Sequence, residues 1–231
     1  MKEKIKILIK TKSNLMIGSA PPPFEIGGGD QYTATTYEGL PYIPASSLKG
    51  TLRGMVHDDK TQDAIKIAKL YETYIENEMN NNWKNSKNNY DAETIRRIEE
   101  RYNIDAKAEF LFGIEGFNNS PKLIINDLHL KDVPENISEC FSIDTKTSIE
   151  SSGDTILSNP RTYKAARSGL VFEGEILFYK FDLLGENAVN ICRNYIIKKL
   201  IQFNNGVYRL GNSKSRGYGR IEVTIDDCEV S

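Results

Sequence analysis

The sequence has few of the features that mark membrane or exported proteins. None of its 231 residues lies in a run approaching the roughly 20 consecutive apolar residues that a membrane helix requires. Residues 1–6 mix charged and aliphatic side chains and lack the apolar stretch and small-residue cleavage site of a signal peptide. We therefore expect a cytoplasmic protein that does not bind a membrane.

Cysteine and histidine are also scarce. Cys140, Cys192 and Cys228 lie far apart and form no Cys-x-x-Cys pair, which favours buried thiols in a reducing compartment over disulfides. His57 and His129 are the only histidines, and neither has a neighbour at metal-ligand spacing. A structural zinc site is therefore not expected.

The chain has no surplus of positive charge, since its formal net charge is −2 at pH 7. Proteins that bind nucleic acids often carry a basic surplus, so the total argues against that function. The distribution differs, because 204–220 contains Arg209, Lys214, Arg216 and Arg220 and no acidic residue. The local field governs the attraction of phosphate, so this pattern permits nucleic-acid binding without predicting it.

Four segments have the apolar patterns of strands. At the N-terminus, Ile5, Ile7 and Ile9 alternate with lysines, a period of two that is typical of a half-buried strand. The expected strands are 3–10, 122–130, 170–182 and 220–225. Residues 17–45 are so rich in glycine and proline that we predict a long loop. Residues 142–169 have no period and are interpreted as an excursion, for which a hairpin is one option.

Apolar residues at helical spacing predict one helix after the long loop, two helical segments in a polar region, and one helix near the C-terminus. The first is capped by Ser46 or Ser47, and the others span about 61–80, 91–102 and 186–202. An asparagine-rich stretch separates the middle pair, because asparagine competes with the helix backbone for hydrogen bonds. We interpret 61–105 as a helical insertion.

Without the insertion and the excursion, the order is strand, helix, strand, strand, helix, strand. This order predicts an α+β fold with a ferredoxin-like (RRM-like) β-α-β-β-α-β core, in a single domain over 1–231. RNA-recognition modules, enzymes and regulatory domains share this fold, so it does not assign a function.

The first candidate site is the start of the helix in 40–53. Ser46 and Ser47 lie where the first turn has free backbone N–H groups, and Lys49 and Arg53 are four residues apart on one helix face. Hydroxyls, free N–H groups and cations together can bind an anion such as RNA phosphate. The alternative interpretation is an ordinary capped helix with exposed basic residues.

The second candidate site is the glycine-rich segment 210–220, Leu-Gly-Asn-Ser-Lys-Ser-Arg-Gly-Tyr-Gly-Arg. Its glycines permit close backbone approach, two cations supply charge, and a tyrosine offers a ring for stacking on a base. These residues are Gly211, Gly217 and Gly219, Lys214 and Arg216, and Tyr218. The spacing differs from the phosphate-binding and dinucleotide-binding glycine motifs. The alternative interpretation is a plain turn.

Together these two segments resemble the RAMP superfamily, and in particular the backbone subunits of type III (Csm/Cmr) CRISPR effector complexes. The segment 39–53 is similar to the signature of the first helix in that family, and 210–220 is similar to its C-terminal glycine-rich loop. Phe110-Leu-Phe-Gly113 and the run from Arg161 to Phe172 lie between them in the family's order.

The resemblance implies a subunit that binds guide crRNA and target single-stranded RNA. It also implies contacts with other Csm/Cmr-type subunits and with copies of itself. A thumb-like hairpin, expected at about 143–166, would kink the guide–target duplex.

In the cutting members of the family, an Asp in the loop after the first strand supports metal-dependent cleavage of target RNA. The matching residue here is Asp30, which would work with Mg²⁺ or another divalent metal. The sequence departs from the family pattern, because 31–36 contains no basic residue where an Arg is expected. The alternative is an Asp that merely favours a turn after glycine.

Three other functions remain open. A non-catalytic scaffold or cap subunit would bind RNA without cutting it. A guide-processing endoribonuclease would cleave without metal and would use a histidine such as His57. A ferredoxin-like regulatory domain unrelated to RNA would leave both long motifs unexplained.

Overall fold

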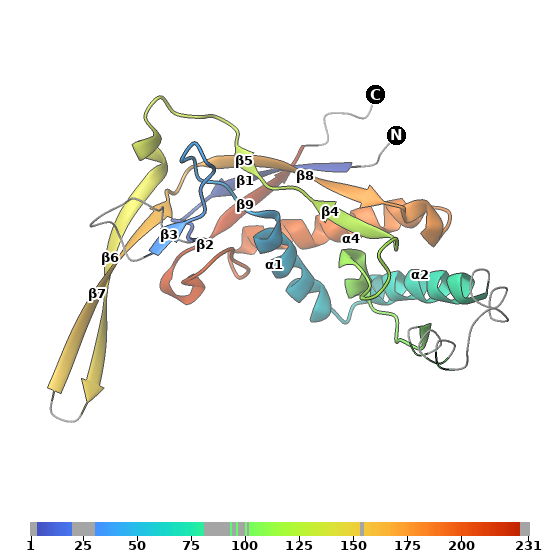
Figure 1. Cartoon of the computed structure of the whole chain (residues 1–231). Helices are drawn as coiled ribbons and strands as arrows, with labels where there is room; N and C mark the ends of the chain where they lie inside the picture. Colours follow the sequence, from blue (N-terminus) through green and yellow to red (C-terminus); the bar gives the residue numbers. More distant parts are fainter. Residues whose placement is uncertain are drawn as a thin grey trace. The chain divides into compact units, whose positions relative to one another are not determined.

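A computed structural model describes most of the chain. The described residues are 4–19, 31–80, 93, 96, 100, 102–152 and 155–226, without the side chains of 19, 146, 148–152 and 155–160. They form a mixed α+β structure with two sheets, which confirms the predicted class (Figure 1). Within the described part, no helix is both long and apolar enough to cross a membrane.

The chain divides into two compact units, each made of separate stretches of sequence. The first unit comprises Met1–Lys4, Leu52–Ile124 and Ile176–Lys199. The second comprises Ile5–Thr51, Ile125–Glu175 and Leu200–Ser231. Both candidate sites of the sequence analysis lie in the second unit, except that Arg53 belongs to the first.

The larger sheet contains the four strands that the apolar patterns predict. Its members are β1 (Lys4–Thr11), β4 (Lys122–Ile125), β5 (His129–Leu130), β8 (Val171–Tyr179) and β9 (Ile221–Ile225). The order is β4-β8-β1-β9, and β5 also pairs with β8. The prediction of one strand over 122–130 is wrong, because a break at 126–128 separates β4 from β5.

The alternating isoleucines of β1 form part of the core. Ile5, Ile7 and Ile9 are each at most 1% exposed. In the antiparallel pairing of β1 with β9, Ile9 lies opposite Val223, which is also buried. The period of two in the sequence therefore reflects one buried face of this sheet.

A second sheet accounts for the segments that have no apolar period. Its strands are β2 (Gly18–Ser19), β3 (Gln31–Thr33), β6 (Phe141–Ser152) and β7 (Thr155–Ala166), in the order β2-β3-β7-β6. β6 and β7 form a long antiparallel hairpin, visible in Figure 1 as an extended two-stranded ribbon. Ile143, Thr145 and Thr147 of β6 are exposed, so no buried face imposes an alternating pattern. The prediction that 17–45 is loop throughout is wrong, since it contains β2 and β3.

Three α-helices complete the described fold. They are α1 (Ala45–His57), α2 (Gln62–Glu78) and α4 (Ala188–Ile201). Leu48, Leu52, Met55 and Val56 of α1 are all buried, as their spacing predicts. The expected segment 91–102 lies largely outside the described residues, although 93, 96, 100 and 102 are helical.

Candidate nucleic-acid interface

The N-terminal turn of α1 is held by a residue that is distant in sequence. The helix begins at Ala45, whose backbone N–H donates a hydrogen bond to Asp127 Oδ1 at 2.7 Å. The prediction that Ser46 or Ser47 caps the helix is therefore wrong. Ser46 is exposed in the first turn, and the Ser47 carbonyl accepts a hydrogen bond from Thr51 Oγ1 at 3.1 Å. The Asp127 carboxylate places a negative charge beside the turn that was expected to attract phosphate.

The two cations predicted on α1 have different surroundings. Lys49 is half-buried in the second unit. Arg53 belongs to the first unit, and its Nε lies 3.4 Å from Glu109 Oε1, with 57% of its side chain exposed. Arg53 is therefore already engaged in an ion pair, although enough of it is exposed to contact a ligand.

Close to this turn, two aromatic rings form a stacked pair that sequence reasoning missed. The centroids of Tyr42 and His129 are 6.0 Å apart, and the planes are inclined by 15°. His129 is exposed on β5. Exposed rings can stack on nucleic-acid bases. Nothing in the sequence signals the pair, because its members come from distant segments.

The glycines of the glycine-rich loop are explained by the chain itself. Gly211 and Gly219 have φ angles of +72° and +75°, which side-chain-bearing residues rarely adopt. A Cβ at Gly211 would collide with the Met16 carbonyl oxygen, and one at Gly219 with the carbonyl oxygen of Leu210. Gly217 is different, because a Cβ there would meet nothing within 4 Å. The sequence predicted that the glycines permit a close approach to the backbone. At Gly211 and Gly219 the group that approaches is a backbone carbonyl of this same chain.

A buried tyrosine fixes this loop to the base of the β6–β7 hairpin. Tyr218 is only 6% exposed and packs with Met16, Tyr163 and Ala165. Its hydroxyl donates a hydrogen bond to the Asp144 carboxylate, and burial, together with this bond, raises the pKa of Tyr218. The prediction that Tyr218 offers a free stacking face is wrong.

The same carboxylate accepts further hydrogen bonds. Asn14 Nδ2 donates to Asp144 Oδ2 at 3.0 Å, and Ser142 Oγ donates to Asp144 Oδ1 at 3.0 Å. The Gly219 N–H donates to the Asn14 carbonyl at 2.9 Å, which ties the loop backbone to the same point. We call Asp144, Tyr218 and Asn14 the loop anchor. Their effect is to hold the loop in one conformation.

The anchored loop exposes its two cations. Lys214 and Arg216 lie on a short 3₁₀ turn, η7 (Lys214–Arg216), and both are exposed. Arg209 Nη1 donates to the Lys214 carbonyl at 2.9 Å and supports the turn. Within the described part of the chain, neither the Lys214 nor the Arg216 side chain has an ion-pair partner. Both are therefore available to an anionic ligand.

A pocket of about 620 Å³ lies at the base of the β6–β7 hairpin. Its lining combines exposed aliphatic side chains with two cations: Gly39, Ile137, Ser138, Phe141, Ile143, Lys164 and Arg167. Ile143 is 72% exposed, and Lys164 Nζ lies 4.8 Å from the centroid of the Phe141 ring. Apolar walls with cations suit an unpaired nucleotide.

The structure does not describe the residue predicted to be catalytic and to bind a metal. Asp30, the predicted catalytic residue and metal ligand, lies outside them. Among the residues that are described, no three His, Cys, Asp or Glu side chains gather into a group that could hold a metal. His57 Nδ1 lies 2.7 Å from Glu109 Oε2, and this hydrogen bond is the main cause that lowers the pKa of Glu109.

Comparisons with known proteins identify the family. A family model described as the RAMP superfamily matches residues 8–222, and the chain belongs to this superfamily. A search of curated proteins found no match. Among solved structures, a chain from the cryo-EM structure of the Type III-B Cmr-beta bound to cognate target RNA is similar, with a TM-score of 0.58 and 17% identity. The match covers 96% of this chain and 59% of that chain, so the chain spans little more than half the length of this neighbour. At this identity the similarity shows a shared fold.

Proposed function

We propose that this protein is a crRNA-binding backbone subunit of a type III CRISPR interference complex. The observation that carries the proposal is membership of the RAMP superfamily over residues 8–222. The fold shared with a chain of a Cmr complex bound to target RNA supports it. Guide crRNA, target RNA, other Csm/Cmr-type subunits and copies of the chain are the partners that this function requires.

We propose in addition that the core is ferredoxin-like. The strand order β4-β8-β1-β9 supports this arrangement. In chain order these strands are second, third, first and fourth, with α1 between the first and second and α4 between the third and fourth. A β-α-β-β-α-β unit has this order when the first strand of each β-α-β half lies at the centre of the sheet, as β1 and β8 do here.

The guide RNA would contact the anchored glycine-rich loop. Lys214 and Arg216 are exposed there on a turn with a fixed backbone, so little conformational entropy is lost when phosphates bind. The pocket at the hairpin base, with Lys164 and Arg167, would take an unpaired nucleotide next to the thumb-like hairpin. Ser46, Ser47, Lys49 and Arg53 of α1 remain further candidates.

Binding of single-stranded RNA across a salt series tests the loop contacts. If both cations contact phosphate, the double variant Lys214→Ala/Arg216→Ala reduces the slope of log affinity against log salt by about 1.4, since each contact with a single strand contributes about 0.7. Lys66→Ala/Lys69→Ala is a matched control, because both residues are exposed cations of α2. An unchanged slope in the loop variant, with the wild type binding RNA, contradicts these contacts.

We further propose that Asp30 supports metal-dependent cleavage of target RNA within the assembled complex. The resemblance of the segment around Asp30 to the cutting members of the family supports this role. The test is Asp30→Ala in reconstituted complexes, with Asp132→Ala, an exposed carboxylate, as the control. Loss of cleavage with intact RNA binding is expected in the first variant only. Cleavage at the full rate by Asp30→Ala complexes would leave a non-catalytic scaffold as the function.

A further inference from the structure

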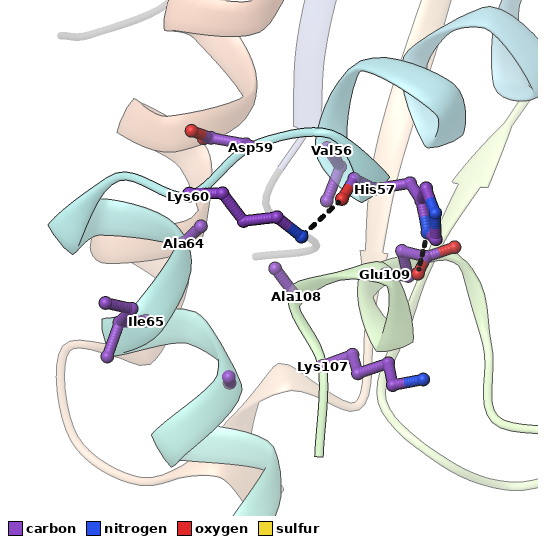
Figure 2. Close-up of a pocket in the computed structure, with 10 residues that line it drawn as sticks. Val56, His57, Asp59, Lys60, Ala64, Ile65, Lys107, Ala108 and Glu109 are labelled. Atoms are coloured by element: carbon purple, nitrogen blue, oxygen red, sulfur yellow. Dashed lines mark hydrogen bonds and ion pairs between the residues drawn. The ribbon is translucent and has the colours of Figure 1, made fainter. Parts of the chain in front are cut away.

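A separate pocket of about 340 Å³ lies within the first unit, where the end of α1, the start of α2 and the 3₁₀ turn η3 (Ala108–Phe112) meet (Figure 2). Small aliphatic side chains form much of its lining. Val56, Ala64 and Ala108 are each at most 8% exposed, while Ile65 is 43% exposed at the edge. The lining residues are Val56, His57, Asp59, Lys60, Ala64, Ile65, Ala68, Lys107, Ala108 and Glu109.

The rim of this pocket is positively charged. Lys60 Nζ donates to the His57 carbonyl at 3.4 Å, and Figure 2 shows this lysine extended toward that carbonyl. Lys107 is exposed on the opposite side and, among the described residues, has no ion-pair partner.

The two acids of the lining are already engaged by other groups. Asp59 forms an ion pair with Lys199 at 2.8 Å. Glu109 contacts His57 at 2.7 Å and Arg53 at 3.4 Å. Neither acid pairs with Lys60 or Lys107, and these two lysines have no ion-pair partner among the residues that the structure describes.

The chemistry of the lining favours a peptide over a nucleotide. A base is normally recognised by a ring that stacks on it or by polar groups that bond its edge. The lining contains no Phe, Tyr or Trp, and the single ring, His57, is bonded to Glu109. An aliphatic floor with a cationic rim instead matches a segment that carries aliphatic and acidic side chains together.

The chain itself contains such a segment after its last strand. Residues 226–231 read Asp-Asp-Cys-Glu-Val-Ser, which combines three acids with Cys228 and Val230. We propose that this pocket binds the C-terminal segment of a second copy of the chain, with Val230 on the aliphatic floor and with Asp227 and Glu229 opposite Lys60 and Lys107. The inference deepens the proposed function and rests on that function, because it assumes that copies of the chain stand side by side along the guide RNA.

Binding of a fluorescein-labelled peptide of residues 225–231, with Cys228→Ser to prevent oxidation, tests the proposal by fluorescence polarisation on the full-length protein. We expect saturable binding that weakens as salt rises. Lys60→Glu/Lys107→Glu should weaken it at least tenfold. Lys66→Glu/Lys69→Glu makes the same charge change outside the pocket on exposed residues and should leave it unchanged.

A charge-reversed peptide sharpens the test. With lysines in place of Asp226, Asp227 and Glu229, it should bind the Lys60→Glu/Lys107→Glu protein better than the wild type. Failure of the wild-type peptide to bind at low salt, or equal binding to the pocket and control variants, would overturn the proposal.

RNA binding by the same variants separates this inference from the proposed function. The pocket variant should retain the RNA affinity of the control. If it loses RNA affinity and the peptide does not bind, the pocket takes RNA phosphate and the inference is wrong. If the peptide does not bind and RNA affinity is intact, the inference fails while the proposed function stands.

Discussion

Each of the two units contains an aspartate that accepts a hydrogen bond from a tyrosine hydroxyl, but the two clusters are built differently. In the second unit the loop anchor joins Asp144 to Tyr218 and Asn14. In the first unit, Asp59 accepts from Tyr195 at 2.9 Å and pairs with Lys199 at 2.8 Å.

We call Asp59, Tyr195 and Lys199 the helix anchor, because it joins the turn between α1 and α2 to α4. Lys199 and Asp59 are 9% and 5% exposed in their side chains, so this is a buried ion pair. Thr61 adds two hydrogen bonds to the carboxylate at 3.0 Å each. The helix anchor therefore stabilises packing inside one unit.

The loop anchor stands beside exposed cations instead. Tyr218 and Gly219 are buried two and three residues after the exposed Arg216. The same pair of residue types therefore supports a helical core in one unit and a loop with exposed cations in the other. Variants of the helix anchor should change stability alone, whereas variants of the loop anchor should change stability and RNA binding together.

The largest effect is expected when the buried ion pair of the helix anchor is broken. Lys199→Met leaves the Asp59 carboxylate buried without its cation, which should lower the free energy of unfolding by about 3–5 kcal/mol. Lys198→Met is the matched control, because Lys198 and Asp63 form an ion pair at 2.6 Å that is 65% and 39% exposed. It should leave the free energy of unfolding nearly unchanged, because water screens an exposed pair. Urea unfolding measures both, and equal losses would show that burial of the pair is unimportant.

A comparable loss is expected in the loop when Gly219 gains a side chain. Gly219→Ala combines an unfavourable φ with a collision with the Leu210 carbonyl, and should lower the free energy of unfolding by about 3 kcal/mol. Gly217→Ala meets only the cost of its φ of +93°, about 1–2 kcal/mol. Thermal unfolding compares the two. A larger loss in Gly217→Ala would contradict the packing described for this loop.

The helix anchor also predicts a dependence of stability on pH. Burial raises the pKa of Asp59, but the hydrogen bonds from Lys199, Thr61 and Tyr195 outweigh it and lower the pKa from 3.8 to about 2. A lowered carboxyl pKa stabilises the fold above the unfolded value, and this stabilisation is lost as pH falls from about 4 to 2. The expected loss is about 2 kcal/mol.

A double variant isolates this contribution. Asp59→Asn/Lys199→Met removes both charges, so it should lose about 2 kcal/mol less stability than the wild type over the same pH range. Urea unfolding at a series of pH values measures the difference. Parallel pH profiles for the two proteins would show that Asp59 does not titrate as proposed.

The smallest effect on stability separates the two anchors most sharply. Tyr195→Phe and Tyr218→Phe each remove one hydrogen bond to a carboxylate, and each should cost about 1.5 kcal/mol. Only Tyr218→Phe should also weaken RNA binding, because its hydroxyl holds the loop that presents Lys214 and Arg216. Filter binding at fixed salt measures this difference. Equal RNA affinity in the two variants would show that the loop anchor does not contribute to RNA binding.

Much of the fold could be predicted because the spacing of apolar residues within a short segment shows which face of that segment is buried. The isoleucines of β1 and the stripe of α1 identify their elements from a few consecutive residues. The same reasoning failed at β6, where an exposed residue such as Ile143 leaves no period to detect. It also failed at the cap of α1, because Asp127 is far from Ala45 in sequence and nothing local distinguishes it from any other surface aspartate.

The candidate site divides in the same way. The exposure of Lys214 and Arg216 could be predicted, because a run of cations without acids is visible in one segment, and their contact with a ligand stays a prediction. Tyr218 could not be assigned, since its role depends on Asp144, which lies on β6 and is distant in sequence.

Residues close together in the chain are enough to predict the α+β class, the strands and helices of the core, and the two motifs that resemble the RAMP superfamily. The tertiary structure is needed to know which glycines face backbone, which carboxylate caps α1, and which tyrosine is buried. Those outcomes depend on contacts between segments that are distant in sequence, and the physical reason is that burial and hydrogen bonding are satisfied in space rather than along the chain.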